Sequence, residues 1–378
     1  MNIVFFIGHL KHGGAEGVVA TLTSELANKG HRISLVCSLR NQIYEVSDTV
    51  NVIDVRNWQY DTSVGNLPQR IYKKIANRFL DLIYISKVIK REQPDVVISF
   101  LVNWLWQIIV LCKGRIPIIS AERNAMVFPH SGKNFWNKQV LYRLADAVQV
   151  MSRYDKAWLR GRYKKIVPMP NPLRFSPLSR SEYDTIFKKR SNILACGRVN
   201  PQKGFEKLIM AFALIADKYP GWNIDICGNF SVNDHYYIAL NNIIGKHGLN
   251  DRINFIGHRK DVNEVMKSHS IFALSSQHEG FPNVLSEAMA NGMACVSFDI
   301  VTGPSEIIND GLDGLIVEDQ NVEALASGIS LLIENEELRY SLGAHAIDNI
   351  SRFSKDKIVD KWECMFNNII KDYNYGKN

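Results

Sequence analysis

The chain has 378 residues, about two to three times the usual length of a single domain, and this length predicts two compact units. Hydrophobic residues make up 46% of it and charged residues 22%, as in an ordinary globular protein, so the composition excludes a long disordered region. The net charge of +7 is unevenly divided: residues 1–175 carry 25 Lys/Arg and 12 Asp/Glu, or +13, whereas residues 176–378 carry 20 and 26, or −6. The basic first half indicates an anionic partner.

The spacing of the cysteines and the length of the apolar runs predict where in the cell the protein lies. The six cysteines are scattered without paired spacing, which favours reduced thiols in a cytosolic protein over disulfides or a metal site. The apolar residues from Met1 to Leu10 lack the basic start and the cleavage site of a signal peptide, so we expect a first buried strand. The longest apolar run, from Leu101 to Cys112, is too short to span a bilayer. Any membrane contact is therefore expected to be peripheral.

Short apolar segments alternate with amphipathic stretches along the whole chain, which predicts parallel sheets covered by helices. The ten predicted strands are Ile3–Ile7, Ile33–Cys37, Val96–Phe100, Ile116–Ser120, Ala147–Val150, Asn192–Cys196, Ile224–Cys227, Ile253–Ile256, Ile271–Leu274 and Cys295–Phe298. Four of the twelve prolines lie between residues 168 and 177 and predict an interdomain linker. We therefore predict an α/β fold of two doubly wound Rossmann-like domains facing a central cleft, residues 1–172 and 173–355, with a C-terminal helix over 356–378 that packs on the first domain.

A glycine-rich loop follows the first predicted strand. Its sequence is His12-Gly13-Gly14-Ala15-Glu16-Gly17, and an amphipathic helix comes after it. Glycines let backbone amides approach a ligand closely, and the amino end of a helix favours an anion. The spacing differs from the dinucleotide-binding fingerprint, so a plain tight turn explains the loop equally well.

A predicted helix from about Pro68 to Arg91 carries two stripes. Arg70, Lys74 and Arg78 are spaced four residues apart beside an apolar face that contains Ile71, Ile75, Phe79 and Leu82. Such a surface suits anionic lipid headgroups or a lipid pyrophosphate, although a merely solvated basic face is the alternative. The same half of the chain also contains five of the seven tryptophans: Trp58, Trp104, Trp106, Trp136 and Trp158.

Two cations follow the first predicted strand of the second half. They are Arg198 and Lys203, in the loop Gly197-Arg198-Val199-Asn200-Pro201-Gln202-Lys203-Gly204. Two cations that converge at a strand end suit a diphosphate, whose charge grows as it leaves. A solvated surface turn is the competing interpretation.

Two glutamates flank the start of a later predicted helix. Glu279 lies in the loop after Ile271–Leu274, and Glu287 lies two turns inside the helix among apolar neighbours. A carboxylate in such a place is costly unless it is ion-paired or accepts hydrogen bonds from hydroxyl groups. Ribose or sugar hydroxyls would satisfy it, and so would a buried ion pair.

Together these motifs resemble the retaining family 4 glycosyltransferases of GT-B fold, in particular the bacterial enzymes of lipid-linked oligosaccharide and surface polysaccharide synthesis. The resemblance spans nearly the whole chain. It rests on Gly13-Gly14-Ala15-Glu16, Gly197-Arg198 with Gln202-Lys203-Gly204, Phe255-Ile256-Gly257, the pair Glu279 and Glu287, Gly303-Pro304-Ser305-Glu306, and Asp313-Gly314-Leu315-Ile316-Val317.

The resemblance implies a role for each matching residue. Arg198 and Lys203 would grip the donor diphosphate and Glu279 would contact the donor sugar, and we name these three as the catalytic residues. Glu287 would bind the ribose and the segment with Arg259 would hold the base. Around the phosphates and the sugar the resemblance places Gly14, Gly197, Gly280, Phe281, Pro282 and Asn283.

One position departs from the family pattern. Many members carry a histidine after the fourth strand of the first domain, where this chain reads Ser120-Ala121-Glu122-Arg123-Asn124. We name Glu122 and Arg123, with Arg70, Lys74 and Arg78, as candidates for acceptor binding. A structural ion pair at the strand end is an equal alternative for Glu122 and Arg123.

The resemblance implies transfer of a hexose or N-acetylhexosamine from a nucleotide sugar to a polyprenyl-diphosphate-linked saccharide, with an α-linkage. The family points to a UDP-sugar as this donor. The absence of an Asp-x-Asp motif predicts transfer without a metal or other cofactor. We expect a cytoplasmic enzyme, peripheral on an anionic inner membrane face, that does not bind nucleic acid. A nonhydrolysing sugar-nucleotide epimerase and a non-catalytic sugar-nucleotide sensor are the alternatives.

Overall fold

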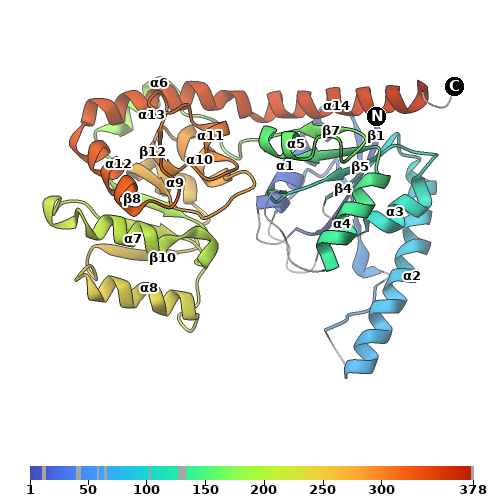
Figure 1. Cartoon of the computed structure of the whole chain (residues 1–378). Coiled ribbons are helices and arrows are strands. Elements are labelled where there is room, and N and C mark those ends of the chain that lie inside the picture. The colour runs from blue at the N-terminus through green and yellow to red at the C-terminus, as the bar shows by residue number, and fades with distance from the viewer. Residues whose placement is uncertain are drawn as a thin grey trace. The chain divides into compact units, whose positions relative to one another are not determined.

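The computed structural model describes residues 1–10, 14–39, 44–57, 59–63, 66–100, 102, 104–126 and 133–375. Contacts within the chain divide it into two compact units (Figure 1). Unit 1 comprises Met1–Arg174 and Lys355–Asn378, and unit 2 comprises Phe175–Ser354. Each unit is described by itself below.

Unit 1 is built on a parallel seven-stranded sheet with the strand order β3-β2-β1-β4-β5-β6-β7. Its strands are β1 Asn2–His9, β2 Arg32–Ser38, β3 Asn51–Asp54, β4 Val96–Phe100, β5 Ile118–Ala121, β6 Ala147–Val150 and β7 Ile166–Pro168. Its helices are α1 Gly14–Asn28, α2 Leu67–Glu92, α3 Leu105–Cys112, α4 Lys133–Leu144, α5 Arg153–Trp158 and α14 Lys355–Tyr375, with a short 3-10 helix at Val55–Asn57.

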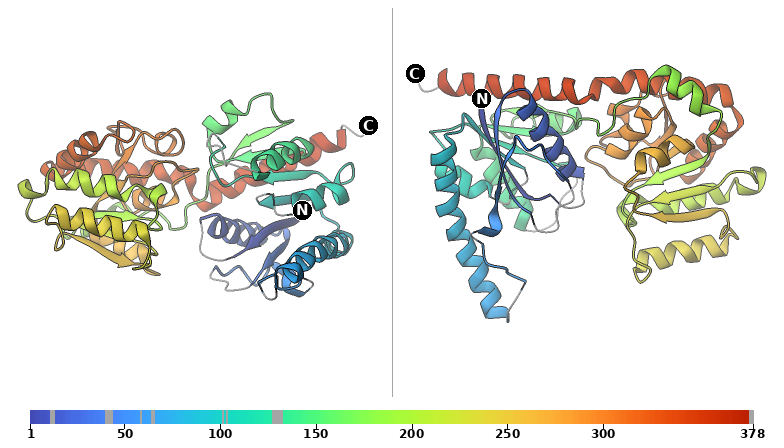
Figure 2. Two further views of the ribbon diagram at one scale, coloured as in Figure 1. Left: turned by 60° about the horizontal axis from the view of Figure 1, so that its bottom comes forward. Right: turned by 180° about the vertical axis from the view of Figure 1, so that it is seen from behind.

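Helices cover both faces of this sheet, as the alternation of side chains along β1 requires. Val4 and Phe6 pack into the core formed with α2, α3 and α4, whereas Phe5 points to the other face and meets Phe366 of α14 edge-on. Trp362 of α14 is fully buried and stacks on Phe100. Helix α14 also lies beside α1, as Figure 2 shows. The C-terminal segment therefore completes the hydrophobic core of unit 1.

Unit 2 has a parallel six-stranded sheet with the order β10-β9-β8-β11-β12-β13. Its strands are β8 Ser191–Cys196, β9 Ile224–Cys227, β10 Ile253–Gly257, β11 His269–Leu274, β12 Ala294–Phe298 and β13 Leu315–Val317. Its helices are α6 Arg180–Phe187, α7 Phe205–Ala213, α8 His235–Lys246, α9 Val262–Ser268, α10 Asn283–Ala290, α11 Pro304–Ile307, α12 Val322–Glu334 and α13 Glu336–Ile350, with 3-10 helices at Pro201–Lys203, Ala216–Lys218 and Ser351–Phe353.

The predicted doubly wound α/β fold is confirmed in both units. Each of the ten predicted strands overlaps an observed strand. The pattern does not reveal β3, β7 and β13, because these strands have three or four residues and no fully buried side chain. Strand β7 ends at Pro168, a residue that indicates a linker in the sequence but that an edge strand tolerates.

Helix α2 begins and ends close to the predicted bounds. Asn66 caps it through a reciprocal pair of hydrogen bonds with Gln69, and Pro68 lies in its first turn. Its fully buried positions all lie in its C-terminal half, between Asp81 and Glu92. The N-terminal half extends past the sheet of unit 1, as Figure 1 shows. Among the described residues, no helix combines the length and the apolar character needed to cross a membrane.

Candidate active site

The donor-site candidates gather at the point where the strand order of the unit 2 sheet reverses. From β8 the chain moves outward to β9 and β10, and it then returns to place β11 on the other side of β8. The loops that follow β8 and β11 therefore part from each other at the carboxyl edge of the sheet. Such a switch point opens a crevice where ligands bind in doubly wound folds. The β8 loop carries Arg198 and Lys203, and the β11 loop carries Glu279.

An ion pair joins these two loops. The Lys203 Nζ lies 2.5 Å from the Glu279 Oε1, and the two side chains are only 16% and 9% exposed. The Ser276 hydroxyl donates to the same Oε1 at 2.7 Å, and no described residue donates to Oε2. The pair holds an ammonium and a carboxylate side by side, one suited to a phosphate and the other to a sugar hydroxyl.

Arg198 differs from Lys203 in its surroundings. Its side chain is exposed and makes no hydrogen bond or ion pair with any residue in the part of the chain that the structure describes. Its neighbour Gly197 packs directly against Lys203, since a Cβ at Gly197 would lie 2.7 Å from the Lys203 Cε. Only a glycine at position 197 leaves room for the lysine stem that reaches Glu279.

Three further glycines allow the loops to approach one another. A Cβ at Gly228, after β9, would lie 1.8 Å from the Gly197 carbonyl oxygen. A Cβ at Gly204 would lie 2.2 Å from the Ser275 carbonyl oxygen, and one at Gly303 would lie 2.6 Å from the Pro282 Cδ. Gly204, Gly228 and Gly303 are not among the predicted site residues. Gly204 and Gly303 lie in motifs of the family resemblance, whereas the only signal of Gly228 in the sequence was a glycine after a strand, which is common and unspecific.

The start of α10 forms the other side of this region. Phe281 and Pro282 are buried, Gly280 and Asn283 are half-buried, and Phe281 packs edge-on against the Phe353 ring. The first backbone amides of the helix point toward its amino end, where an anion is favoured. Because α10 begins only at Asn283, Glu287 lies one turn inside the helix and not two as predicted, and it is 7% exposed.

Arg259 follows β10 and forms a two-pronged ion pair with Asp261, with bonds of 2.8 Å and 2.6 Å. The guanidinium lowers the pKa of Asp261 to about 2. Both side chains are largely exposed. The base-binding role of Arg259 stays a prediction.

The glycine loop of unit 1 is described only in part. Gly14 begins α1, and Glu16 in its first turn lies 3.2 Å from His9. His12 and Gly13 lie outside the described residues, as do Trp58 and the side chain of Trp136.

Glu122 and Arg123 follow β5 and belong to a buried polar network. Glu122 has no exposed surface, and its carboxylate accepts hydrogen bonds from Lys138 at 2.8 Å and Tyr142 at 2.9 Å. The Arg123 guanidinium donates to Asn171 and Gln149, each at 2.7 Å. The ion pair of Glu122 is therefore with Lys138 and not with the Arg123 side chain. Every one of these partners lies in unit 1, so the network supports a structural role, and acceptor binding by these two residues stays a prediction.

Burial and neighbouring charge shift the pKa of the Glu122 carboxyl group in opposite directions. Burial raises its carboxyl pKa, but the Lys138 ammonium, together with hydrogen bonds from Arg123 N–H and Tyr142, outweighs burial and holds that pKa below the usual value. Burial lowers the pKa of Arg123. Its guanidinium also stacks on the Phe100 ring, 4.5 Å from the ring centre.

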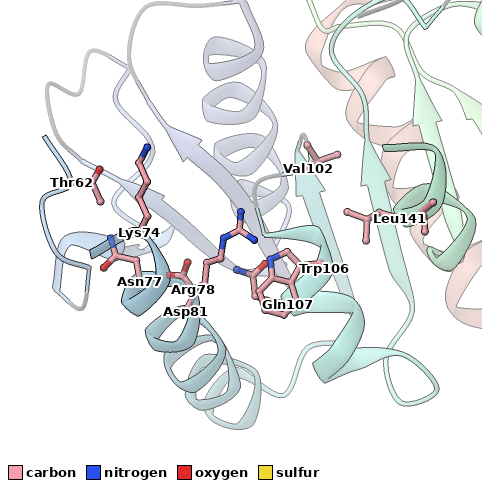
Figure 3. A pocket seen from close by; sticks show the side chains of 10 residues that line it. Thr62, Lys74, Asn77, Arg78, Asp81, Val102, Trp106, Gln107 and Leu141 are labelled. Carbon is pink, nitrogen blue, oxygen red and sulfur yellow. The ribbon is translucent and has the colours of Figure 1, made fainter. Parts of the chain in front are cut away.

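The three predicted cations of α2 have different surroundings. The Arg70 Nε donates to the Thr62 carbonyl oxygen at 3.2 Å. Lys74 and Arg78 line a cavity of about 750 Å³ between α2, α3 and α4 (Figure 3). Of the apolar face predicted beside them, Ile71, Ile75 and Phe79 are exposed, with Phe79 65% and Ile75 53% exposed, whereas Leu82 is half-buried.

No group of three or more potential metal-ligating side chains occurs among the described residues. Metal independence stays a prediction from the sequence.

Two family models match the chain, one in each unit. "Glycosyltransferase Family 4" matches residues 12–174, and "Glycosyl transferases group 1" matches residues 181–348. Together the two matches span every strand of both sheets except β1.

Several known proteins are similar to the chain. An undecaprenol-diphosphate-linked saccharide α-1,4-N-acetyl-D-galactosaminyltransferase of Campylobacter jejuni is 26% identical over 365 residues, which cover 96% of this chain and 97% of that protein. An exopolysaccharide phosphotransferase of Streptomyces coelicolor is 37% identical over 232 residues, but the match spans only 24% of its length. The crystal structure of Anabaena HepE in complex with UDP and glucose matches the fold with a TM-score of 0.74 at 20% identity, covering 97% of this chain and 100% of that one.

Proposed function

Since the chain belongs to the family 4 glycosyltransferases of GT-B fold, we propose that it transfers a hexose or N-acetylhexosamine from a UDP-sugar to a polyprenyl-diphosphate-linked saccharide. The reaction retains the anomeric configuration and forms an α-linkage. The full-length similarity to an enzyme named for an undecaprenol-linked acceptor supports the acceptor class. Bound UDP in a solved structure of the same fold supports the donor class.

The proposed step breaks the bond between the anomeric carbon and the β-phosphate oxygen, whose electron pair stays on the departing UDP. An acceptor hydroxyl attacks the anomeric carbon from the same face. Its proton passes to the departing phosphate oxygen. The leaving diphosphate gains negative charge, so fixed cations lower the barrier more than a general acid would.

The observation that carries this proposal is the cation and carboxylate arrangement at the unit 2 switch point. Lys203 is held in place by Glu279, which leaves its ammonium fixed before any ligand arrives. Arg198, exposed and unpaired among the described residues, is available for the second phosphate. The Glu279 Oε2 is available for a sugar hydroxyl. A preorganised group of this kind needs little rearrangement during the reaction.

Substitution of the two cations tests these roles. We expect Arg198→Ala and Lys203→Ala each to lower kcat by roughly 10²- to 10³-fold, with a smaller change in the Kd for UDP. Lys246→Ala is the matched control, because Lys246 is an exposed cation at the end of α8. Released UDP is measured with a panel of UDP-sugars and a lipid-diphosphate acceptor. Unchanged kcat in both variants would remove the assignment.

Two further measurements separate the proposed reaction from its alternatives. Nuclear magnetic resonance of the product reports whether the new linkage is α, and a β-linkage from an α-linked donor would contradict retention. Incubation with the UDP-sugar alone tests epimerisation, because an epimerase converts the donor without an acceptor. Donor binding with no turnover under either condition would instead indicate a sensor.

We also propose that α2 places the enzyme on an anionic inner membrane face. Its exposed apolar stripe recurs every four residues, and a basic stripe of Arg70, Lys74 and Arg78 runs beside it. The stripe consists of Leu67, Ile71, Ile75, Phe79 and Ile83. Unit 1 carries 30 Lys/Arg and 16 Asp/Glu, or +14. Apolar insertion and attraction to anionic lipid act together on such a helix.

Liposome flotation tests this contact. We expect the protein to float with vesicles that contain anionic phospholipid at low salt, and to lose most of this binding when Ile75 and Phe79 are both replaced by Ser. The control is Val232→Ser, because Val232 is an apolar side chain of unit 2 that is 63% exposed. Equal flotation of the α2 double variant and the wild type would overturn the proposal.

A further inference from the structure

The two carboxylate oxygens of Glu279 have different surroundings. The Oε1 atom accepts hydrogen bonds from the Lys203 ammonium at 2.5 Å and from the Ser276 hydroxyl at 2.7 Å. No described residue donates to Oε2, and Oε2 is not fully buried, so a ligand can reach it. Two donors on one oxygen hold the carboxylate in one orientation and leave the other oxygen as an acceptor.

The Lys203 ammonium alone would not fix this orientation. An ammonium carries three N–H donors around one charge, so it can bond to both oxygens of a carboxylate at once. Without a second donor, the Glu279 carboxylate could rotate until both oxygens face the ammonium, and no oxygen would remain for a ligand. The Ser276 hydroxyl has a single proton and lies three residues before Glu279 in the same loop. It therefore favours the orientation in which only Oε1 is occupied.

The backbone around Glu279 is held by two neighbouring loops. The Thr302 hydroxyl, which is only 1% exposed, donates to the Glu279 carbonyl oxygen. The Gln202 side-chain amide donates to the His278 carbonyl oxygen at 3.0 Å. Because the backbone is already held in this way, the Ser276 hydroxyl acts on the direction of the carboxylate itself.

The same serine–glutamate spacing also occurs where it has a structural purpose. Ser179 and Glu182 form a capping box at the start of α6. No helix begins at Ser276, because α10 begins only at Asn283. The Ser276 side chain is buried, so its hydroxyl gives up hydration in order to bond to a carboxylate at the switch point of the sheet. This bond therefore serves the Glu279 carboxylate and not the end of a helix.

We infer that Ser276 is a positioning residue for the donor: by holding Glu279 Oε1 together with Lys203, it directs Oε2 at one hydroxyl group of the donor sugar. A hydroxyl group that donates to a carboxylate forms a short, charge-assisted hydrogen bond. The inference rests on the proposed function for the identity of the donor. It adds a residue that is not among the predicted site residues and states how that residue acts on the sugar.

Binding of deoxygenated donors tests the inference without any turnover. UDP-glucose, UDP-galactose, UDP-N-acetylglucosamine and UDP-N-acetylgalactosamine are titrated calorimetrically in the absence of an acceptor. The donor that binds most tightly is then compared with analogues that each lack one sugar hydroxyl. We expect one analogue to bind the wild type about 10-fold more weakly than its parent, because it lacks the hydroxyl that donates to Oε2. In Ser276→Ala the ratio of these two Kd values should fall to about 2.

A second buried serine provides the matched control. Ser297 has no exposed surface, and its hydroxyl donates to the Phe298 carbonyl oxygen at 3.0 Å. Ser297→Ala should keep the ratio of about 10. UDP itself should bind Ser276→Ala within about twofold of the wild type, because the substitution leaves Lys203 in place. Thermal melts report whether each variant folds, and Ser276→Cys replaces the alanine variant if that variant does not fold, since a thiol is a weak donor.

A double-variant cycle tests whether the serine acts through the glutamate. Glu279→Gln should also lower the ratio to about 2, because an amide oxygen is a weaker acceptor than a carboxylate oxygen. Adding Ser276→Ala to this variant should then have no further effect on the ratio. A further fall in the double variant would contradict a role that is exerted through Glu279.

The outcomes distinguish this inference from the function it rests on. If no analogue binds the wild type more weakly than its parent, or if the ratio stays near 10 in folded Ser276→Ala, the inference is wrong, even if the enzyme transfers sugar from UDP. An equal loss of affinity for UDP and for every donor in Ser276→Ala would also overturn it, because that pattern indicates a general disturbance of the site. If the ratio depends on Ser276 but no sugar is transferred to a lipid-linked acceptor, Ser276 positions a donor-binding carboxylate and the proposed transferase activity is wrong.

Discussion

Replacement of Gly228 by alanine should damage the proposed donor site without touching any of its charged groups. The new Cβ would lie 1.8 Å from the Gly197 carbonyl oxygen, whereas real Cβ atoms essentially never come closer than 3.0 Å to another heavy atom. The β8 loop and the segment at Gly228 must therefore separate by about 1.2 Å, and the β8 loop carries Arg198 and Lys203. A misplacement of about 1 Å can cost on the order of 100-fold in rate, or about 2.7 kcal/mol in the activation barrier.

The assay compares kcat/KM for UDP release, together with the Kd for UDP, in the wild type, Gly228→Ala and Gly221→Ala. Gly221 belongs to the same unit, and its Cβ would meet nothing within 4 Å, so its substitution should leave both quantities unchanged. Overpacking can also cost about 1–3 kcal/mol of stability, so all rates are measured well below the melting temperature of each variant. If folded Gly228→Ala keeps kcat/KM within about threefold of the wild type, the close approach of the two strand ends does not set the position of the cations.

Three other changes test the remaining structure. Trp362→Ala should lower the free energy of unfolding by about 3–5 kcal/mol in urea titrations, because the fully buried indole stacks on Phe100. Lys138→Met should lower the free energy of unfolding by about 3–5 kcal/mol at pH 7, because it leaves the Glu122 carboxylate buried without its cation. The folded pKa of Glu122 lies below its unfolded value, so the stabilisation by Lys138 is present above the unfolded pKa and is lost as the pH falls through the folded pKa. The difference in the free energy of unfolding between Lys138→Met and the wild type should therefore become smaller as the pH is lowered from 7. All six cysteines are free, and Cys364 is the exposed one. Native protein should therefore react with one equivalent of iodoacetamide, at Cys364. Reaction of a second cysteine at a rate equal to or above that of Cys364 would contradict the burial of the other five.

Periodic and local features of the chain were predictable. The strands with buried runs, such as Val96–Phe100, are found because every side chain in them is apolar or small. Pro94 and Asp95 mark the start of this strand. The start of α2 follows from Pro68 and the polar residues around it, whose effect depends only on near neighbours. The short edge strand β7 could not be predicted in this way, because a proline such as Pro168 occurs both in edge strands and in linkers.

The uneven charge of the chain, ten of the strands that the structure describes, and Arg198 and Lys203 as candidate phosphate-binding cations could be inferred from the amino-acid sequence alone. These properties depend on composition and on residues close together in the chain. The partners of those residues could not. Glu279 meets Lys203 across 76 positions, and Lys138 meets Glu122 across 16, only because the sheets bring separate loops together. The hydrophobic periodicity of α2 also could not predict whether the Ile75 and Phe79 side chains are buried or exposed, since an amphipathic helix has the same period in both cases. Tertiary packing decides which face meets the core, and in α2 it leaves the apolar stripe exposed.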